Sequence, residues 1–200
     1  MLDYEKKFEG KVIAGIDEAG RGPLAGPVVC ACVIMSLESD KIIEGINDSK
    51  KLTEKKRETL YEKIIETAIA YSIVEVDEKC IDEINILNAT KKGMEEALNN
   101  LNVKPDIVLI DAVKINTDIK QENIIKGDAL SYNIASASIL AKVYRDRKML
   151  ELDKIYPQYN FAKHKGYGTK AHIQALKEFG KCRYHRETYI KNFKIDKKLD

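Results

Sequence analysis

The chain has 200 residues, of which 44% are hydrophobic and 33% are charged, and its formal net charge is +2. This length suits one well-cored domain, so we predict a single domain over residues 1–200. No run of residues approaches the roughly 20 apolar residues of a membrane helix. The first residues also lack the apolar stretch of a secretory signal, and we therefore expect a cytoplasmic protein with no membrane contact.

The small net charge conceals an uneven distribution. Residues 1–141 contain 18 Lys and Arg against 25 Asp and Glu, whereas residues 142–200 contain 16 against 7. An acidic body suits cations, and a basic C-terminal quarter suits a polyanion. A metal-dependent enzyme acting on nucleic acid needs this combination, and uneven but solvated surface charge is the plainer alternative.

The first part of the chain is predicted to form strands with one helix among them. Residues 11–17 predict a strand, and the apolar run 28–35 predicts a second strand that is buried on both faces. Because the link between them is short, we expect these two strands to pair antiparallel. Residues 52–70 predict an amphipathic helix, and residues 71–76 a third strand.

The second part is richer in helices. Residues 81–101 predict a helix, and residues 106–111 a fourth strand that ends on an acid. A weak strand over 119–125 precedes a long helix over 131–152, and 170–178 predicts another helix. Strands reached both by short turns and through a helix imply a mixed sheet with helices packed on it, which places the chain in the α/β class.

The cysteines and histidines do not point to zinc or disulfides. Cys30 and Cys32 lie two apart in an apolar strand, so they share one face and are expected to be small buried hydrophobes. None of the three histidines has the spacing of a zinc motif. An all-oxygen site for Mg²⁺ or Mn²⁺ is therefore favoured over a zinc site.

Carboxylates end two of the predicted strands. Asp17 and Glu18 end the first strand, Asp111 ends the fourth, and Asp128 stands just before the long helix. If the first and fourth strands are parallel neighbours, Asp17 and Asp111 leave the sheet at the same edge. Two cations about 4 Å apart at such a site activate a water and stabilise the leaving oxygen of a phosphodiester. A single acid at the end of a strand is usually an ordinary surface residue with no role in a site.

A glycine-flanked arginine follows the first acids. Gly20-Arg21-Gly22 is not a dinucleotide fingerprint, because Gly26 comes one place too late and a strand follows instead of a helix. A turn that exposes its amides can instead hydrogen-bond a phosphate or a sugar hydroxyl, and the 2′-OH distinguishes RNA from DNA.

A second glycine-rich segment lies in the basic quarter. In residues 164–169 the ring of Tyr167 stands between two glycines, close to His164 and Lys165, and is placed to stack on a sugar or base. A structural tyrosine is the alternative. The candidate phosphate contacts are Lys50, Lys142, Arg145 and Arg147.

Four blocks of the sequence resemble the signature blocks of bacterial ribonuclease HII. They are Gly-Ile-Asp-Glu-Ala-Gly-Arg-Gly-Pro-Leu-Ala-Gly-Pro-Val-Val at 15–29, Asp-Ser-Lys-Lys-Leu at 48–52, Ala-Ser-Ala-Ser-Ile-Leu-Ala-Lys-Val-Tyr-Arg-Asp-Arg at 135–147 and His-Lys-Gly-Tyr-Gly-Thr at 164–169. Order and spacing agree from about residue 10 to 186. The related ribonuclease HIII carries an additional N-terminal domain, whereas here fewer than twenty residues precede the first acids, which favours HII.

The resemblance implies a ribonuclease H-like fold, with a mixed five-stranded sheet flanked by helices and a small basic helical extension over about 155–200. It implies a metal-dependent endonuclease that cleaves the RNA strand of RNA/DNA hybrids and incises duplex DNA on the 5′ side of embedded ribonucleotides, leaving 5′-phosphate and 3′-hydroxyl ends. We expect the enzyme to use two Mn²⁺ or Mg²⁺ ions and to be a monomer. Whether it binds a sliding clamp is left open by the sequence.

The resemblance also assigns residues. The metal-binding and catalytic acids are Asp17, Glu18, Asp111 and Asp128, and Asp118 and Asp146 are weaker candidates for the fourth position. Gly20, Arg21 and Gly22 read the 2′-OH, while Tyr167 stacks on the sugar beyond it. Lys50, Lys142, His164 and Lys165 complete the substrate-binding set.

Two other functions remain open from the sequence. A hybrid-binding protein without catalysis would use the acids structurally, although converging acids repel a polyanion unless a cation intervenes. A nuclease or integrase of the same fold with another substrate would differ around Arg21 and Tyr167. The residues from Ile190 to Asp200 are expected to form a frayed basic tail.

Overall fold

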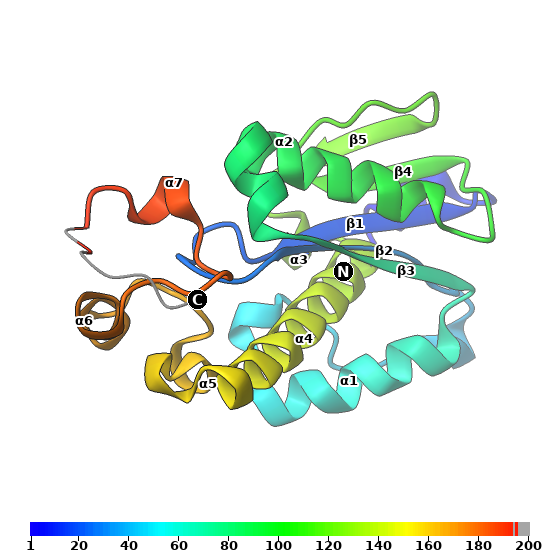
Figure 1. Ribbon diagram of the computed structural model, residues 1–200. Helices are drawn as coiled ribbons and strands as arrows, with labels where there is room; N and C mark the ends of the chain where they lie inside the picture. The colour runs from blue at the N-terminus through cyan, green and yellow to red at the C-terminus, as the bar shows by residue number, and fades with distance from the viewer. Residues whose placement is uncertain (194, 196–200) are drawn as a thin grey trace.

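The computed structural model describes residues 1–193 and 195 (Figure 1). The strands are β1 (Ile13–Ala19), β2 (Val28–Ile34), β3 (Ala70–Val76), β4 (Ile107–Asp111) and β5 (Lys120–Ile124). The helices are α1 (Glu54–Thr67), α2 (Glu78–Asn99), α3 (Gly127–Leu130), α4 (Tyr132–Ile155), α5 (Phe161–His164), α6 (Lys170–Phe179) and α7 (Glu187–Ile190). Short 3₁₀ turns cover Glu5–Phe8, Ser39–Lys41, Ser49–Lys51 and Pro157–Tyr159. Within these described residues, no helix combines the length and apolarity needed to cross a membrane.

The strands form one mixed five-stranded sheet in the order β3-β2-β1-β4-β5. β1, β2 and β3 pair antiparallel, whereas β1 pairs with β4 and β4 with β5 in parallel. The predicted α/β class and mixed sheet are confirmed. In the parallel pair Ile16 lies opposite Ile110, so Asp17 and Asp111 follow side by side at the same sheet edge.

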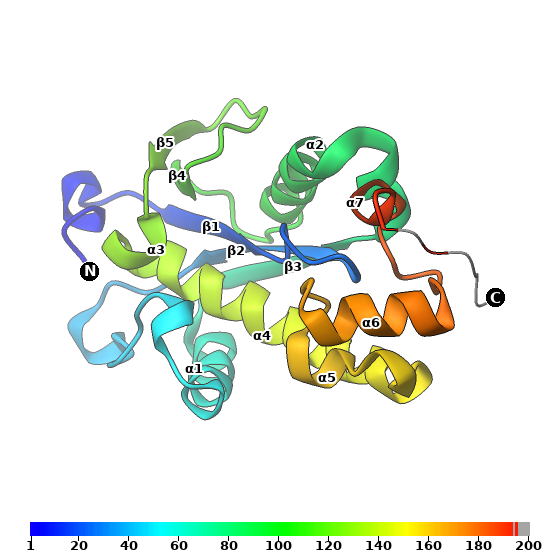
Figure 2. The ribbon, with the colours of Figure 1, turned by 90° about the vertical axis from the view of Figure 1, so that its left-hand side faces the viewer.

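Helices cover both faces of the sheet (Figures 1 and 2). α2 packs on one face, where it meets Cys30 and Cys32, and α1 and α4 pack on the other. Every residue of β2 is buried, as the apolar run predicts, and both cysteines face the same core. The approach of α4 to β1 is close at Gly15, because a Cβ there would lie 2.2 Å from the backbone carbonyl carbon of Asn133. A side chain at this position would push α4 away from β1.

Capping side chains fix where the helices begin. Thr53, Asp77, Ser131 and Thr169 each accept a hydrogen bond from a backbone N–H in the first turn of α1, α2, α4 and α6. The Asp77 cap explains why α2 begins at Glu78, ahead of the predicted residue 81. The other predicted elements exist with ends displaced by a few residues, and α4 continues past residue 152 to Ile155.

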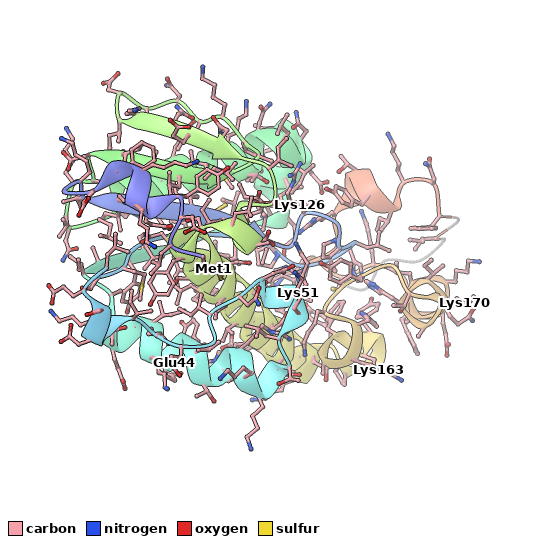
Figure 3. All side chains as sticks on the ribbon, turned by 180° about the vertical axis from the view of Figure 1, so that it is seen from behind. Met1, Glu44, Lys51, Lys126, Lys163 and Lys170 are labelled. Atoms are coloured by element: carbon pink, nitrogen blue, oxygen red, sulfur yellow. The ribbon has the colours of Figure 1, made fainter. Side chains whose placement is uncertain are left out.

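The C-terminal helices α5, α6 and α7 gather at one end of the molecule, beyond the end of α4 (Figures 1 and 2). A separate apolar cluster that includes Met149, Phe161 and Leu176 holds them there. Lys163 and Lys170 lie at this end, away from Glu44 on the body (Figure 3). The predicted tail begins too early, because Ile190 ends α7 and is buried in the same cluster. Residues 194 and 196–200 of that tail lie outside the described residues.

Candidate active site

The four predicted acids come from one edge of the sheet and the short helix beside it. Asp17 and Glu18 lie near the end of β1, Asp111 ends β4, and Asp128 lies in α3. The Asp111 Oδ1 accepts a hydrogen bond from the Gly127 N–H at 3.0 Å, which fastens the start of α3 to the end of β4. The Glu18 N–H donates to the Asp17 Oδ1 at 2.8 Å. Strand register and one backbone bond therefore bring acids separated by more than 90 residues into the same region.

Burial and repulsion by neighbouring carboxylates make Asp17 and Glu18 costly to ionise. Burial raises the pKa of Asp17 well above its usual value, the charges of Glu18 and Asp111 raise it further, and a hydrogen bond from Ser138 opposes them. Burial also raises the pKa of Glu18, where Arg21 opposes the shift. The Glu18 Oε2 is buried without a hydrogen-bond partner. The site thus holds carboxylate charge that the protein leaves incompletely compensated.

Two cationic side chains reach the acids. The Lys50 Nζ lies 3.4 Å from the Asp128 Oδ2, and the Arg21 Nη1 lies 3.5 Å from the Glu18 Oε1. Burial lowers the pKa of Lys50, but the charges of Asp128 and Asp17 more than offset this and the net pKa is raised. Both cationic groups are largely exposed on their other side, so they balance the acids only in part.

The donor chemistry of the acids fits a hard divalent cation. In the described part of the chain, no three His, Cys, Asp or Glu side chains form a group that could hold a metal ion as they stand. The four acids nevertheless offer only oxygen, repel one another and include one buried oxygen without a partner. Mg²⁺ and Mn²⁺ bind such oxygen donors, and a bound cation removes the repulsion. The acids would hold the ion after Lys50 and Arg21 release the oxygens they now contact.

The Gly20-Arg21-Gly22 turn follows β1 directly. Gly20 has a φ of +99°, and a Cβ there would lie 2.0 Å from the Arg145 Nε, so no larger residue fits. At Gly22 a Cβ would lie 3.6 Å from the Tyr167 Cε1, which places the tyrosine ring against the turn. Tyr167 is 45% exposed, and its ring is available to a ligand.

The turn, one of the acids (Glu18) and several basic residues line one cleft of about 220 Å³. Its lining residues are Glu18, Ala19, Gly20, Arg21, Gly22, Ser49, Lys50, Ser138, Lys142, Arg145 and Tyr167. A larger cleft of about 600 Å³ lies between α2 and the C-terminal segment, but none of the predicted site residues lines it. The smaller cleft is the candidate active site because the reactive groups converge there.

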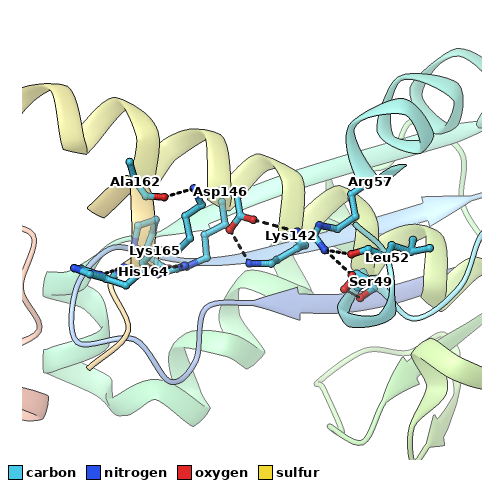
Figure 4. A network of polar contacts seen from close by, with 12 residues as sticks. Ser49, Leu52, Arg57, Lys142, Asp146, Ala162, His164 and Lys165 are labelled. Atoms are coloured by element: carbon cyan, nitrogen blue, oxygen red, sulfur yellow. Dashed lines mark hydrogen bonds and ion pairs between the residues drawn. The ribbon is translucent and has the colours of Figure 1, made fainter. Parts of the chain in front are cut away.

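Lys142 projects into this cleft from α4 as part of a charged network (Figure 4). Its Nζ lies 2.7 Å from the Asp146 Oδ1, and the second Asp146 oxygen lies 4.0 Å from the Arg57 guanidinium. Arg57 in turn donates to the carbonyls of Ser49 and Leu52. Burial lowers the pKa of Lys142, and Asp146 opposes that shift. Asp146 therefore belongs to this ion pair and not to the group of acids.

Comparison with known proteins identifies the family. The profile of the family described as Ribonuclease HII matches residues 14–193. The chain belongs to the ribonuclease HII family. The ribonuclease HII of Ruminiclostridium cellulolyticum is 58% identical over 197 residues, which cover 96% of this chain and 76% of that protein.

Solved structures share the fold. The structure of the PCNA:RNase HII complex from Archaeoglobus fulgidus has a TM-score of 0.78 and 27% identity, covering 94% of this chain and 98% of that chain. Bst-RNase HIII in complex with Mn²⁺ has a TM-score of 0.63 at 16% identity, with 84% and 63% covered, and shares the fold alone. Ribonuclease HII enzymes are metal-dependent and cleave RNA in RNA/DNA hybrids and at embedded ribonucleotides, so the chain is a ribonuclease H.

Two of the substrate-binding residues expected for a ribonuclease HII lie outside the cleft. His164 is buried; its Nε2 donates to the Tyr159 carbonyl at 2.7 Å and its Nδ1 accepts from the Gly166 N–H at 3.2 Å. Lys165 directs its Nζ to the Ala162 carbonyl at 2.5 Å. In this structure their polar atoms shape the loop that carries Tyr167, and their role as substrate ligands stays a prediction.

Two of the candidate phosphate contacts are also engaged elsewhere. Arg145 is 1% exposed and donates to the carbonyls of Ala25, Pro27 and Lys165, so its role in the cleft wall is structural. Arg147 pairs with Glu58 and Glu62 of α1. Charge and helix position alone predicted phosphate contacts here, and these contacts stay predictions.

The weaker candidates for the fourth acid are separated from the others. Asp118 is exposed and precedes β5, at the end of the sheet opposite to Asp111, because β5 and β4 are parallel. Asp146 is held by Lys142. Asp128 is the candidate that stands beside Asp111, through the bond to Gly127.

Sequence reasoning missed two hydroxyls at the site. The Ser138 hydroxyl opposes the raised pKa of Asp17 and lies 2.9 Å from the Ser49 hydroxyl. Its neighbours Ala137 and Ile139 pack in the core between α4 and the sheet. No sequence signal distinguishes a helix serine that only packs against the sheet from one whose hydroxyl also hydrogen-bonds an acid of the sheet.

Proposed function

We propose that Asp17, Glu18, Asp111 and Asp128 hold two divalent ions, Mn²⁺ or Mg²⁺, at the edge of the sheet. The observation that carries this proposal is the buried, mutually repelling group of acids with an unpartnered oxygen on Glu18. When bound, such ions activate a water and stabilise the leaving oxygen of a phosphodiester. The protein's own part is to hold these four acids together through the strand register and the Asp111–Gly127 bond.

The Gly20-Arg21-Gly22 turn would supply the selectivity for ribose. It lines the same cleft as Glu18, and its two glycines have no side chain to screen the backbone amides from a ligand. Backbone N–H groups can donate to a ribose 2′-OH, which deoxyribose lacks. Tyr167 beside Gly22 would stack on the adjoining sugar. Together these contacts place the phosphodiester on the 5′ side of the ribonucleotide against the acids, giving 5′-phosphate and 3′-hydroxyl ends.

Lys50 and Lys142 would contact the backbone phosphates. Both line the cleft, and the Lys50 side chain is 79% exposed. A phosphodiester that arrives with a divalent ion offers Lys50 a new anionic partner as it leaves Asp128. Of the predicted basic set, Lys50, Lys142 and Arg145 line the cleft, and the Arg145 guanidinium is bonded to backbone carbonyls.

The test compares three duplexes of one sequence: an RNA/DNA hybrid, a DNA duplex with one ribonucleotide, and an all-DNA duplex. We expect cleavage of the first two in Mn²⁺ or Mg²⁺, with the cut on the 5′ side of the single ribonucleotide, and none with a chelator. Efficient cutting of the all-DNA duplex would remove the proposed 2′-OH role. Binding of the hybrid without cutting in either metal would favour a non-catalytic hybrid-binding protein.

We also propose that the chain acts as a monomer and as one domain, on RNA/DNA hybrids and ribonucleotide-containing DNA. A relative of 27% identity was solved in complex with PCNA, which supports testing a sliding-clamp contact here. Light scattering after size-exclusion chromatography should give one chain per particle, and co-elution with a bacterial clamp tests the contact. A dimer would contradict the monomeric state. Separate elution of clamp and enzyme would contradict a sliding-clamp contact.

A further inference from the structure

Arg186 is a fully buried arginine whose guanidinium grips the backbone of the Gly20-Arg21-Gly22 turn. It is 0% exposed, yet it lies far along the chain from the acids, immediately before α7. Its Nη2 donates to the Gly20 carbonyl at 2.6 Å and its Nη1 to the Arg21 carbonyl at 2.9 Å. Its Nε and Nη2 also donate to the Gly26 carbonyl, at 2.9 and 2.7 Å. One side chain therefore closes both ends of the loop that connects β1 to β2.

The charge of Arg186 has no carboxylate in salt-bridge contact among the described residues. Burial lowers its pKa, and the charges of Tyr189, Glu78 and Asp82 oppose that shift. A buried guanidinium is expensive, and here the carbonyl dipoles of the turn satisfy it. This cost is more than general packing requires, because an apolar side chain fills a core at lower cost.

The geometry of the peptide bond links these carbonyls to the amides on the other side of the turn. In a trans peptide the C=O of one residue and the N–H of the next lie in one plane and point in opposite directions. No cis peptide bond occurs among the described residues. Because Arg186 holds the carbonyls of Gly20 and Arg21, the amides of Arg21 and Gly22 must point away from it.

We propose that Arg186 is the positioning residue for ribose selectivity, because it orients the Arg21 and Gly22 amides toward the 2′-OH. This inference rests on the proposed role of the turn as the reader of the ribose. The guanidinium acts only through the backbone and touches no substrate. Its rigid fork of donors suits three carbonyl partners, whereas a lysine ammonium cannot span them.

Tyr189 holds the same turn from the same side. Its hydroxyl donates to the Arg21 carbonyl at 2.8 Å, and its ring lies 5.1 Å from the Arg186 guanidinium. Arg145 grips the loop as well, but through the carbonyls of Ala25 and Pro27, which lie past the turn. The carbonyls of Gly20 and Arg21 are thus assigned to Arg186 and Tyr189.

The test measures binding of a single-ribonucleotide duplex and of the matched all-DNA duplex by fluorescence anisotropy in Ca²⁺. Cleavage kinetics in Mn²⁺ then separate kcat from KM. The variants are Arg186→Lys and Tyr189→Phe, with the exposed Arg183→Lys as the matched control. Arg186→Lys should reduce the ribose preference, the ratio of the two dissociation constants, by about tenfold. Tyr189→Phe should reduce it by about threefold, and Arg183→Lys should leave it unchanged.

The outcomes separate the inference from the function beneath it. A wild-type protein without ribose preference overturns the role of the turn itself, and the inference with it. A wild-type preference that persists in folded Arg186→Lys, or an equal loss of affinity for both duplexes, overturns the positioning role alone. If Arg186→Lys does not show a cooperative melt, Tyr189→Phe decides the question, because it keeps the ring and removes one hydroxyl.

Discussion

Two clusters of buried titratable side chains lie in this molecule, and they are built on opposite principles. The acids at the sheet edge repel one another, and Glu18 keeps an oxygen without a partner. The histidine cluster of His164, His172 and His185 in the C-terminal segment is satisfied instead. The Cys182 N–H donates to the His185 Nδ1, and the His185 and His172 Nε2 atoms lie 3.0 Å apart.

The bonding of the histidine cluster fixes the tautomers. Because the His185 Nδ1 accepts, its Nε2 carries the proton and donates to the His172 Nε2. The His172 Nδ1 then donates to the Tyr167 carbonyl at 3.0 Å. The chain of bonds is complete only with neutral rings, and burial lowers the pKa of His172 to about 4 and of His185 to about 3.

The comparison teaches how to tell a reactive cluster from a structural one. A cluster whose members complete one another's hydrogen bonds stabilises the fold and has no capacity left for a ligand. A cluster of like charges with an unused oxygen is stabilised when a cation binds to it.

The largest effect is expected from Asp17→Asn. Removing one acid from the proposed metal site should reduce cleavage of the single-ribonucleotide duplex by roughly 10³-fold or more. Without divalent ions the variant should be more stable than the wild type by about 1 kcal/mol, because a buried, repelled charge is gone. Gel-based cleavage assays and urea unfolding measure the two quantities. Wild-type turnover would remove Asp17 from the site.

In the histidine cluster we expect the opposite effect on stability. His185→Ala breaks the bond to His172 and leaves a cavity beside Tyr159 and Phe161, at a cost of about 2–4 kcal/mol. Urea unfolding at pH 7 measures this. A loss below about 0.5 kcal/mol would show that the histidine cluster is not a structural core.

Acid should weaken the wild-type fold through the same histidines. Their folded pKa values lie below the unfolded value of about 6.5, so the unfolded state binds more protons as the pH falls. Between pH 7 and pH 5 each ring should lower the unfolding free energy by about 2 kcal/mol.

The raised pKa values of Asp17 and Glu18 work with the opposite sign, because those acids take up protons in the folded state first. The comparison of wild type with His185→Ala at both pH values isolates the histidines, since the acids are common to both. The variant should lose about 2 kcal/mol less than the wild type on acidification. Equal losses would contradict the neutral buried rings.

Sequence reasoning succeeded where function is local in the chain. Glu18 and the Gly20-Arg21-Gly22 turn are nearly contiguous in the chain, so their meeting in one cleft needed no tertiary information. Asp111 was expected beside Asp17 because strand ends in a parallel pair share an edge, and the register agrees. The assignments of these residues as metal or ribose ligands stay predictions.

Sequence reasoning did not find the contacts of side chains whose partners are distant in the chain. Lys142 and Arg145 of α4 both line the cleft, and residue spacing does not show that the Arg145 guanidinium is bonded to the carbonyls of a distant loop. His164 shares a motif with Tyr167 but turns into the core. Arg186 gave no signal, because its partners are backbone atoms some 160 residues earlier.

A smaller effect is expected from Tyr167, where the two clusters meet. Its carbonyl receives the histidine chain while its ring lines the cleft. Tyr167→Ala should lower kcat/KM for the single-ribonucleotide duplex about tenfold, whereas Tyr167→Phe should keep most of it, because stacking needs only the ring. Equal defects in both variants would assign the effect to the hydroxyl instead.

The smallest effect is expected from Arg147→Ala. The guanidinium is engaged by Glu58 and Glu62 on the surface of α1, outside both clusters. Its removal should cost less than about 1 kcal/mol of stability and change KM less than about twofold. A tenfold rise in KM would restore Arg147 as a phosphate contact.

Titration with Mn²⁺ by isothermal calorimetry at pH 7 tests most directly whether the unsatisfied cluster is the cation site. The wild type and His185→Ala should bind Mn²⁺ alike, while Asp17→Asn should bind at least about tenfold more weakly. Equal binding by Asp17→Asn and the wild type would contradict the account.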